Sequence, residues 1–129
     1  MKIFKRNRFK VMMLTVVLLV MSSSTDVFAA NTEVGVVAGV TATANSNINS
    51  TFAQSSTSAS GISTYVSATY SYIDVNTLQT GTSSSSRGYY SNSSVSFNAP
   101  TNCRSVNIKG SHEAVSGNQK WSAKTDAVY

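Results

Sequence analysis

The residues with the most reactive side chains stand close together near the C-terminus. Residues 103–121, CRSVNIKGSHEAVSGNQKW, contain the only cysteine, histidine and tryptophan of the chain. A cysteine thiolate beside a histidine base could act as a nucleophile, provided that a third group orients the base. Whether Cys103 and His112 can meet depends on the secondary structure of this segment.

Strand geometry separates the two residues. Side chains alternate between the two faces of a strand, so Val106, Ile108 and His112 share one face while Cys103 lies on the other. Nine residues of extended strand span roughly 30 Å. We therefore expect no catalytic pair. His112 is predicted to face the core beside Trp121, and Cys103 is predicted to be a half-exposed free thiol. An odd cysteine in a secreted chain could alternatively form an intermolecular disulfide.

The same alternation predicts a C-terminal hairpin over residues 103–129. A two-residue turn at Gly117-Asn118 suits this segment, because both residue types accept positive φ. The resulting register pairs Ala114 with Trp121, His112 with Ala123, Ile108 with Ala127 and Val106 with Tyr129. All these apolar side chains then lie on one face without adjustment, so Trp121 and Tyr129 are predicted to be core residues.

Other catalytic or ligand-binding motifs are not found in the sequence. The four acidic residues after position 30 are far apart in sequence, and one histidine with one cysteine cannot make a zinc site alone. Residues 81–88, GTSSSSRG, lack the Gly-Lys-Ser/Thr ending of a phosphate loop and are read as a flexible turn. We therefore expect a protein that is not an enzyme and uses no metal or cofactor.

The N-terminus has the order of features of a secretory signal peptide. Five basic residues in the first ten positions precede the apolar run of residues 11–21, and VFAA supplies small residues for cleavage. We place the signal peptide at residues 1–29, with cleavage after Ala29 and Ala30 as the second choice. The apolar run is shorter than the about 20 residues needed to span a bilayer. The expected location is secreted and extracellular, with no membrane span after cleavage.

The basic character of the chain comes mostly from this leader. The whole sequence carries a net charge of +5, whereas the part after Ala29 has five basic and four acidic side chains, which gives +1. A phosphate-binding surface needs clustered Lys and Arg. A nucleic-acid partner is therefore not supported.

The remaining chain, residues 30–129, is read as a single Ser/Thr/Asn-rich β domain. Val, Ile, Tyr and Thr suit a pleated, half-buried surface, whereas helix formers are scarce. The predicted fold is all-β, a small antiparallel β-sandwich. Strands are expected over residues 34–44, 62–75, with a bulge near its end, and around Val95 and Phe97; residues 45–61 are expected to be loop or weak edge strand, and residues 76–88 a turn region.

The C-terminal segment carries a family resemblance. Trp121-Ser-Ala123 followed by the terminal Tyr129, with the leader and the Ser/Thr/Tyr-rich body, resembles small secreted β-proteins of Gram-positive bacteria and is similar to the lactococcin-like bacteriocins. The bacteriocin resemblance implies an antibacterial protein acting at the cell envelope and transfers no site residue. The favoured function is a non-enzymatic surface or matrix interaction protein with a cell-envelope, glycan or protein ligand. A glycan-binding module is a third reading, with Tyr65, Tyr89, Tyr90 and Trp121 as candidate stacking side chains.

Overall fold

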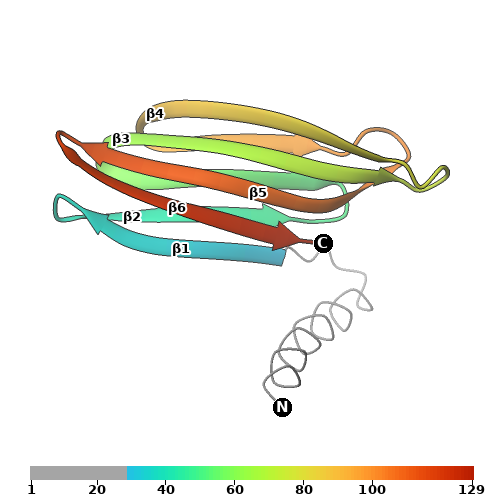
Figure 1. Ribbon diagram of the computed structural model, residues 1–129, viewed down its shortest axis with the longest axis horizontal. Coiled ribbons are helices and arrows are strands. Elements are labelled where there is room, and N and C mark those ends of the chain that lie inside the picture. The colour runs from blue at the N-terminus through green and yellow to red at the C-terminus, as the bar shows by residue number, and fades with distance from the viewer. Residues whose placement is uncertain (1–28) are drawn as a thin grey trace, which may run out of the picture.

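The chain folds into antiparallel strands (Figure 1). The computed structural model describes residues 29–129, and this part of the chain contains no helix. The all-β prediction is confirmed. The proposed signal peptide and its apolar run lie outside the described residues. The strands are β1 (Ala29–Val37), β2 (Val40–Ile48), β3 (Phe52–Asp74), β4 (Thr80–Asn98), β5 (Cys103–Ser116) and β6 (Gln119–Val128).

All six strands belong to one sheet, in the order β1-β2-β3-β5-β6, with β4 paired to β3. The first half of β3 pairs with β2 on one side and with the second half of β4 on the other. The second half of β3 lies between β5 and the first half of β4. Because β3 and β4 both continue through the fold, a single folded sheet replaces the two separate sheets of the predicted sandwich.

The sheet folds at a bend shared by β3 and β4. Ser58 of β3 pairs with Asn92 of β4, and the next pair joins Ser63 to Tyr90. Residues 59–62 of β3 are therefore unpaired with β4, where only Ser91 lies between the two pairs. Gly61 and Ser91 have φ values of 77° and 66°, and the Gly61 N–H donates to Ser91 Oγ over 2.9 Å. Glycine adopts positive φ without a steric penalty. The bend also moves the buried positions of β3 from odd numbers before it to even numbers after it.

The core lies between the two halves of the folded sheet and divides into two clusters. In the larger one, Tyr70 of β3 stacks on Phe97 of β4 with ring centroids 5.5 Å apart, and its hydroxyl lies 2.8 Å from Ser105 Oγ. The smaller cluster contains Val37, Ala42, Ala59, Ile62 and Ala114. Small side chains occupy much of this interior, so β1 and β6 approach closely, as Figure 1 shows along the lower side of the molecule.

Three segment predictions are wrong. Residues 34–44 form a hairpin of β1 and β2 rather than one strand, since Ala38 and Gly39 both have positive φ and make the turn. Residues 45–61 are not a loop but complete β2 and begin β3. Residues 76–88 contain only a short turn, because β4 already begins at Thr80 and includes the GTSSSSRG segment. These Ser/Thr-rich stretches become strands by pairing with neighbours distant in sequence.

The C-terminal hairpin has the predicted register. Ala114 pairs with Trp121, His112 with Ala123 and Ile108 with Ala127, with Gly117 at positive φ in the turn. The bulge expected near the end of residues 62–75 is not in that strand. The β3–β5 pairing does shift between Ser71 and Tyr72, but the extra residue is Val106 of β5, and the β3–β4 pairing is continuous there.

The predicted burial of Trp121 and Tyr129 is only partly right. Both side chains pack against the core clusters, yet both stay partly exposed because they lie at the margin of the sheet. Gly35 of β1 lies directly under the Trp121 ring, where any Cβ would overlap the indole. The absence of a side chain at position 35 therefore lets β1 lie against β6.

Gly35→Val is expected to lower the free energy of unfolding by about 1–3 kcal/mol, because the new side chain must displace Trp121. Urea denaturation followed by circular dichroism measures the change. In a Trp121→Ala background the same substitution should cost much less, since the overlap is gone. Thr41→Val, at an exposed position of β2, should change stability by less than about 0.5 kcal/mol. Equal costs of Gly35→Val in both backgrounds would contradict the contact.

Candidate functional site

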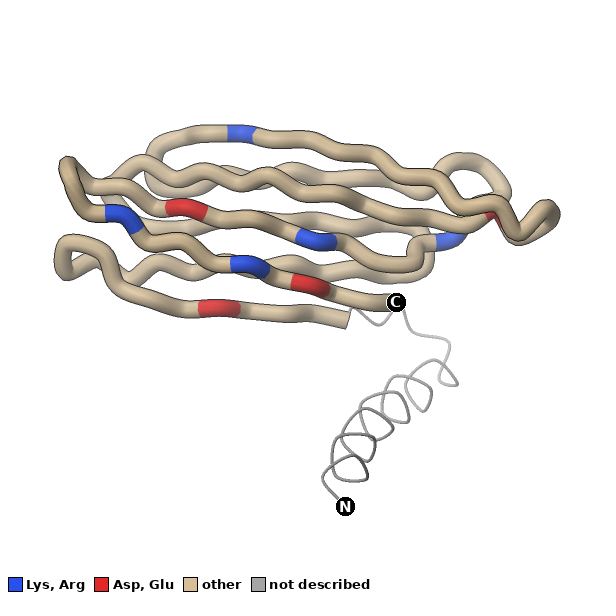
Figure 2. The backbone as a smooth tube through the Cα atoms, viewed as in Figure 1, with Lys and Arg blue, Asp and Glu red and all other residues tan. Residues whose placement is uncertain are grey.

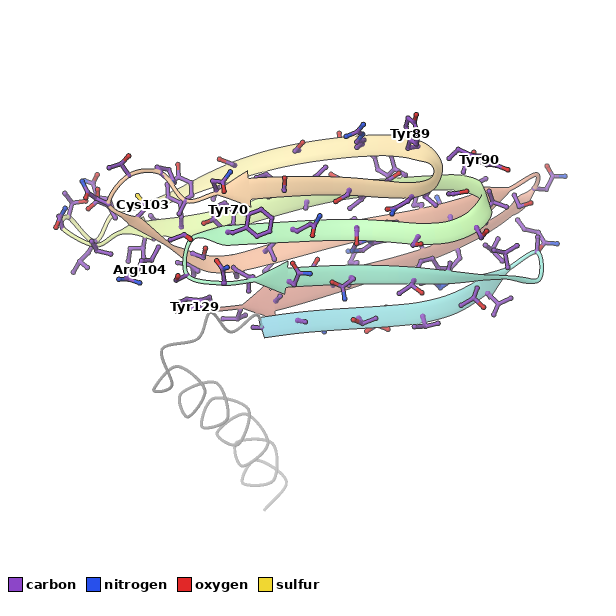
Figure 3. All side chains as sticks on the ribbon, turned by 180° about the vertical axis from the view of Figure 1, so that it is seen from behind. Tyr70, Tyr89, Tyr90, Cys103, Arg104 and Tyr129 are labelled. Atoms are coloured by element: carbon purple, nitrogen blue, oxygen red, sulfur yellow. The ribbon has the colours of Figure 1, made fainter. Side chains whose placement is uncertain are left out.

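Cys103 and His112 lie in different surroundings. Cys103 begins β5, pairs with Asp74 and is partly exposed, near the end of the molecule opposite Tyr89 and Tyr90 (Figure 3). Partial burial, and then the Asp74 charge, raise the pKa of its thiol, which disfavours the reactive thiolate. His112 pairs with Val66 nine positions along the same strand and is 1% exposed. The structure therefore does not bring the two side chains together.

His112 is held in a buried network of hydroxyl groups. Its Nδ1 lies 2.8 Å from Thr57 Oγ1, and its Nε2 lies 2.7 Å from Thr125 Oγ1. The chain of hydrogen bonds continues from Thr125 to Ser46 and from Ser46 to Ser55 over 2.8 Å. All five side chains are buried. The network joins β2, β3, β5 and β6 through the middle of the core.

A missing side chain makes room for this network. Gly110 lies two residues before His112 on the same face of β5. A Cβ at position 110 would overlap Ser55 Oγ and His112 Nε2 and would come 2.8 Å from Thr125 Oγ1. A glycine is therefore needed where the imidazole and the hydroxyl groups pack.

The hydrogen bonds determine the tautomer of His112. Thr57 donates its hydroxyl proton to the Tyr65 carbonyl over 2.8 Å, so Thr57 Oγ1 can only accept from the imidazole. Nδ1 therefore carries the proton, and Nε2 accepts from Thr125. Thr125 in turn accepts from Ser46. Ser46 thus donates to Thr125, and Thr125 donates to Nε2. A proton added to Nε2 would have no acceptor unless both of these hydrogen bonds reversed their direction.

This environment keeps His112 neutral. Burial lowers the pKa of the imidazole from 6.5 to about 4, and a backbone hydrogen bond to Ser56 offsets only part of that effect. The ring is sealed from solvent and so cannot accept a proton from a substrate bound at the surface. Its hydroxyl partners satisfy both ring nitrogens, which is the arrangement of a structural core histidine.

The lowered pKa predicts that stability depends on pH. The unfolded chain binds a proton at His112 below pH about 6.5, whereas the folded chain does so only near pH 4. The stability that the protein gains by keeping His112 neutral is therefore complete above pH 6.5 and is lost as the pH falls toward 4. The expected loss is about 3 kcal/mol, since one pKa unit corresponds to about 1.4 kcal/mol.

Urea denaturation between pH 7 and about pH 4.5 tests this expectation, because most of the loss falls within that window. His112→Gln should flatten the dependence in the same range. A two-dimensional NMR titration of the imidazole gives a direct reading in the wild-type protein. Titration of the folded ring near pH 6.5 would contradict the buried network.

The candidate ligand-binding surface lies on the opposite side of the sheet. Cross-strand pairing of β4, β3, β5 and β6 aligns side chains in four rows on this side of the sheet. We call the surface made by these four rows the outer face. The rows are Tyr90-Ser63-Val115-Lys120, Gly88-Tyr65-Glu113-Ser122, Ser86-Ser67-Ser111-Lys124 and Ser84-Thr69-Lys109-Asp126. Hydroxyl groups occupy the centre of this outer face, and charged side chains lie toward β6.

Two shallow depressions join on the outer face. One, of about 480 Å³, extends from Tyr65 across Glu113 and Ser122 to Lys124. The other, of about 630 Å³, includes Ser67, Thr69 and Lys109 and reaches β1. Ser111 and Lys124 line both depressions. Together they form one trough that crosses β3, β5 and β6, with polar groups set among a larger apolar surface.

Charges of both signs surround this trough. Figure 2 shows acidic and basic positions alternating over β5, β6 and β1. Lys109 and Lys124 line the second depression together with Glu33 and Asp126. At its β1 side, the Oδ1 atom of Asn31 is buried and has no hydrogen-bond partner within the described residues. The trough therefore offers donors and acceptors without a strong net charge.

The four candidate stacking residues do not form one platform. Tyr65 and Tyr90 share the outer face, with 40% and 63% of their surfaces exposed. Tyr89 points to the opposite face, where Arg87 lies 5.7 Å from its ring centroid. Trp121 faces β1 and packs on Gly35. Only Tyr65 lines the trough.

Sequence reasoning missed most of the trough. Ser67, Ser111 and Lys124 become neighbours only through the registers of β3 with β5 and of β5 with β6. The β5–β6 register was readable from the hairpin, but nothing local specified how β3 pairs with β5. The alternation of Tyr65, Ser67 and Thr69 was the one signal that these residues share a face.

Comparisons with known proteins add no assignment: no family model, curated protein or solved structure matches this chain. Residues 29–129 contain no helix that could cross a bilayer. Within the same residues, no group of three or more His, Cys, Asp and Glu side chains lies close enough to hold a metal ion. The outer face, which carries both depressions, is the candidate site of the described chain.

Proposed function

We propose that the protein is a secreted, non-enzymatic surface-interaction protein that binds a glycan of the cell envelope or matrix through the outer face. The observation that carries this proposal is the trough that begins at the exposed ring of Tyr65 and continues past hydroxyl groups to Lys124, with polar groups set among apolar surface. A sugar ring presents an apolar face that can stack on an aromatic ring and hydroxyl groups that need donors and acceptors around it.

The shape and charge of the trough favour this ligand over other classes. A small-molecule site is usually a cleft that encloses its ligand, whereas this trough is shallow and open, and its lining combines Ser, Thr, Lys and Asp with Tyr65 and Ala123. A polyanion would need a surface with an excess of positive charge. Here Glu33, Glu113 and Asp126 offset Lys109 and Lys124. An uncharged or weakly charged extended polysaccharide fits the mixture best.

Tyr65→Ala is expected to weaken retention on insoluble cell-wall polysaccharide about five- to thirtyfold, because loss of a stacking ring removes on the order of 1–2 kcal/mol. A pull-down with purified cell walls, followed by measurement of the free protein, gives the apparent affinity. Lys124→Ala should weaken binding as well, since Lys124 lines both depressions.

Tyr89→Ala is the matched control, because Tyr89 is as exposed as Tyr90 but points to the opposite face. It should bind as the wild type does. Loss of binding for Tyr89→Ala, with Tyr65→Ala unaffected and both variants folded, would refute the assignment of the outer face. Growth inhibition of related strains without polysaccharide binding would favour the bacteriocin-like alternative instead.

A further inference from the structure

Strand β4 has an unpaired edge along its whole length. Its 19 residues, Thr80–Asn98, pair only with β3. In an antiparallel strand, alternate residues direct their N–H and C=O groups away from a given neighbour. About half of the β4 residues therefore present both groups on the side away from β3. Figure 1 shows β4 along the upper margin, with no described strand beyond it.

The other two edge strands protect each other. β1 and β6 lie side by side, with Trp121 packed over Gly35. The Gln119 side chain accepts a hydrogen bond from the Ala38 N–H over 2.9 Å. The edge of β4 has no such cover among the described residues, which makes it the exception in this fold.

The first half of β4 also lacks the usual features that prevent edge pairing. Proteins commonly place lysines, prolines or bulges on exposed edges. Between Thr80 and Tyr90 the only charged residue is Arg87, and there is no lysine or proline. Every side chain from Thr82 to Tyr90 is exposed, so nothing on either face of this segment blocks an approaching strand. The bend at Ser91 ends the straight segment.

We propose that this edge pairs with the same edge of a second copy of the chain, which forms a two-fold symmetric dimer with one continuous sheet. The register that pairs the whole of Thr80–Tyr90 with itself has its centre at Ser85. Arg87 then faces Ser83 of the second copy, so the two guanidinium groups do not oppose each other. At the centre, Ser84 faces Ser86 and Ser85 faces Ser85 of the second copy, so hydroxyl groups can hydrogen-bond across the strands.

This register also opposes Tyr89 to Gly81 of the second copy. The chain already uses that combination within β3 and β4, where Tyr72 covers Gly81 and Tyr65 lies over Gly88. An aromatic ring over a glycine shields backbone that lacks a side chain. Because Tyr72 already lies over Gly81, Tyr89 of the second copy would meet the Tyr72 ring there, and the symmetric pair brings these two rings together twice.

A second copy fits this edge better than an unrelated peptide. Strand addition takes its affinity from main-chain hydrogen bonds and its sequence specificity from pockets beside the edge. The two depressions lie on β1, β3, β5 and β6, and neither includes a β4 residue. The edge therefore offers main-chain pairing without pockets that would select another sequence.

Analytical ultracentrifugation of the purified protein under reducing conditions tests the proposal, because reduction excludes a dimer linked through Cys103. The weight-average mass measured by sedimentation should rise with protein concentration to twice the monomer mass and then stay constant. The double variant Ser83→Lys/Ser85→Lys should raise the dimer dissociation constant at least about tenfold. The added charge at position 83 would face Arg87 of the second copy, and the two charges at position 85 would face each other.

Thr41→Lys/Ser60→Lys adds the same charge at exposed positions of β2 and β3 and should dimerise as the wild type does. Hydrogen exchange should slow in Thr80–Tyr90 as the wild-type concentration rises. A wild-type protein that stays monomeric at millimolar concentration would overturn the proposal. So would a Ser83→Lys/Ser85→Lys variant that dimerises normally, or masses that grow beyond a dimer. The polysaccharide-binding test with Tyr65→Ala is a separate measurement, so failure of the dimer proposal and failure of the proposed function can be told apart.

Discussion

The fold depends on one strand that serves both halves of the sheet. β3 pairs on both sides before its bend and again after it, and it is the only strand that contacts β2, β4 and β5 through main-chain pairing. The bend at Gly61 is therefore a constraint on every other element. Without the change in buried parity at that point, one half of β3 would turn its apolar side chains toward solvent.

A second constraint is the scarcity of large apolar side chains. Serine and threonine occupy core positions that would hold Val or Leu in most domains, and each hydroxyl group must then find a partner inside the protein. Tyr70 bonds to Ser105, Thr64 bonds to Ser93, and His112 of β5 connects hydroxyl groups of three other strands, β2, β3 and β6. Because these bonds require particular partners, they select one arrangement of strands more strictly than apolar contacts alone would.

The sequence specified local pairing well and distant pairing poorly. The β5–β6 hairpin was predictable because two alternating patterns of matched parity flank a Gly-Asn turn. The β1–β2 hairpin was missed for two reasons. Ala38-Gly39 is a less distinctive turn, and from Val34 to Ala44 every second residue is apolar, as in one continuous strand. The strand around Val95 and Phe97 was predicted, but the first half of β4 was missed because GTSSSSRG has no apolar alternation.

The candidate site shows the same limit. The exposure of Tyr65 and the central position of His112 follow from strand parity, which the sequence displays. The trough and the hydroxyl network depend on which strand lies beside which. Ser46 and Thr125, for example, are neighbours across the core although they are distant in sequence. No pattern within either strand marks them as partners.

The central position of β3 also governs the order in which the chain can fold. Its pairs with β4 start from a short turn, and the β5–β6 hairpin is equally local, but the β3–β5 pairs join Ser63 to Val115 across the whole of β4. Closing such a loop costs chain entropy before any distant contact repays it. We therefore expect docking of the C-terminal hairpin onto β3 to be slower than formation of either hairpin. Until then, Val66, Ala68 and Tyr70 lack the β5 and β6 part of their cover, so the apolar side chains in the second half of β3 are among the last to be shielded from water.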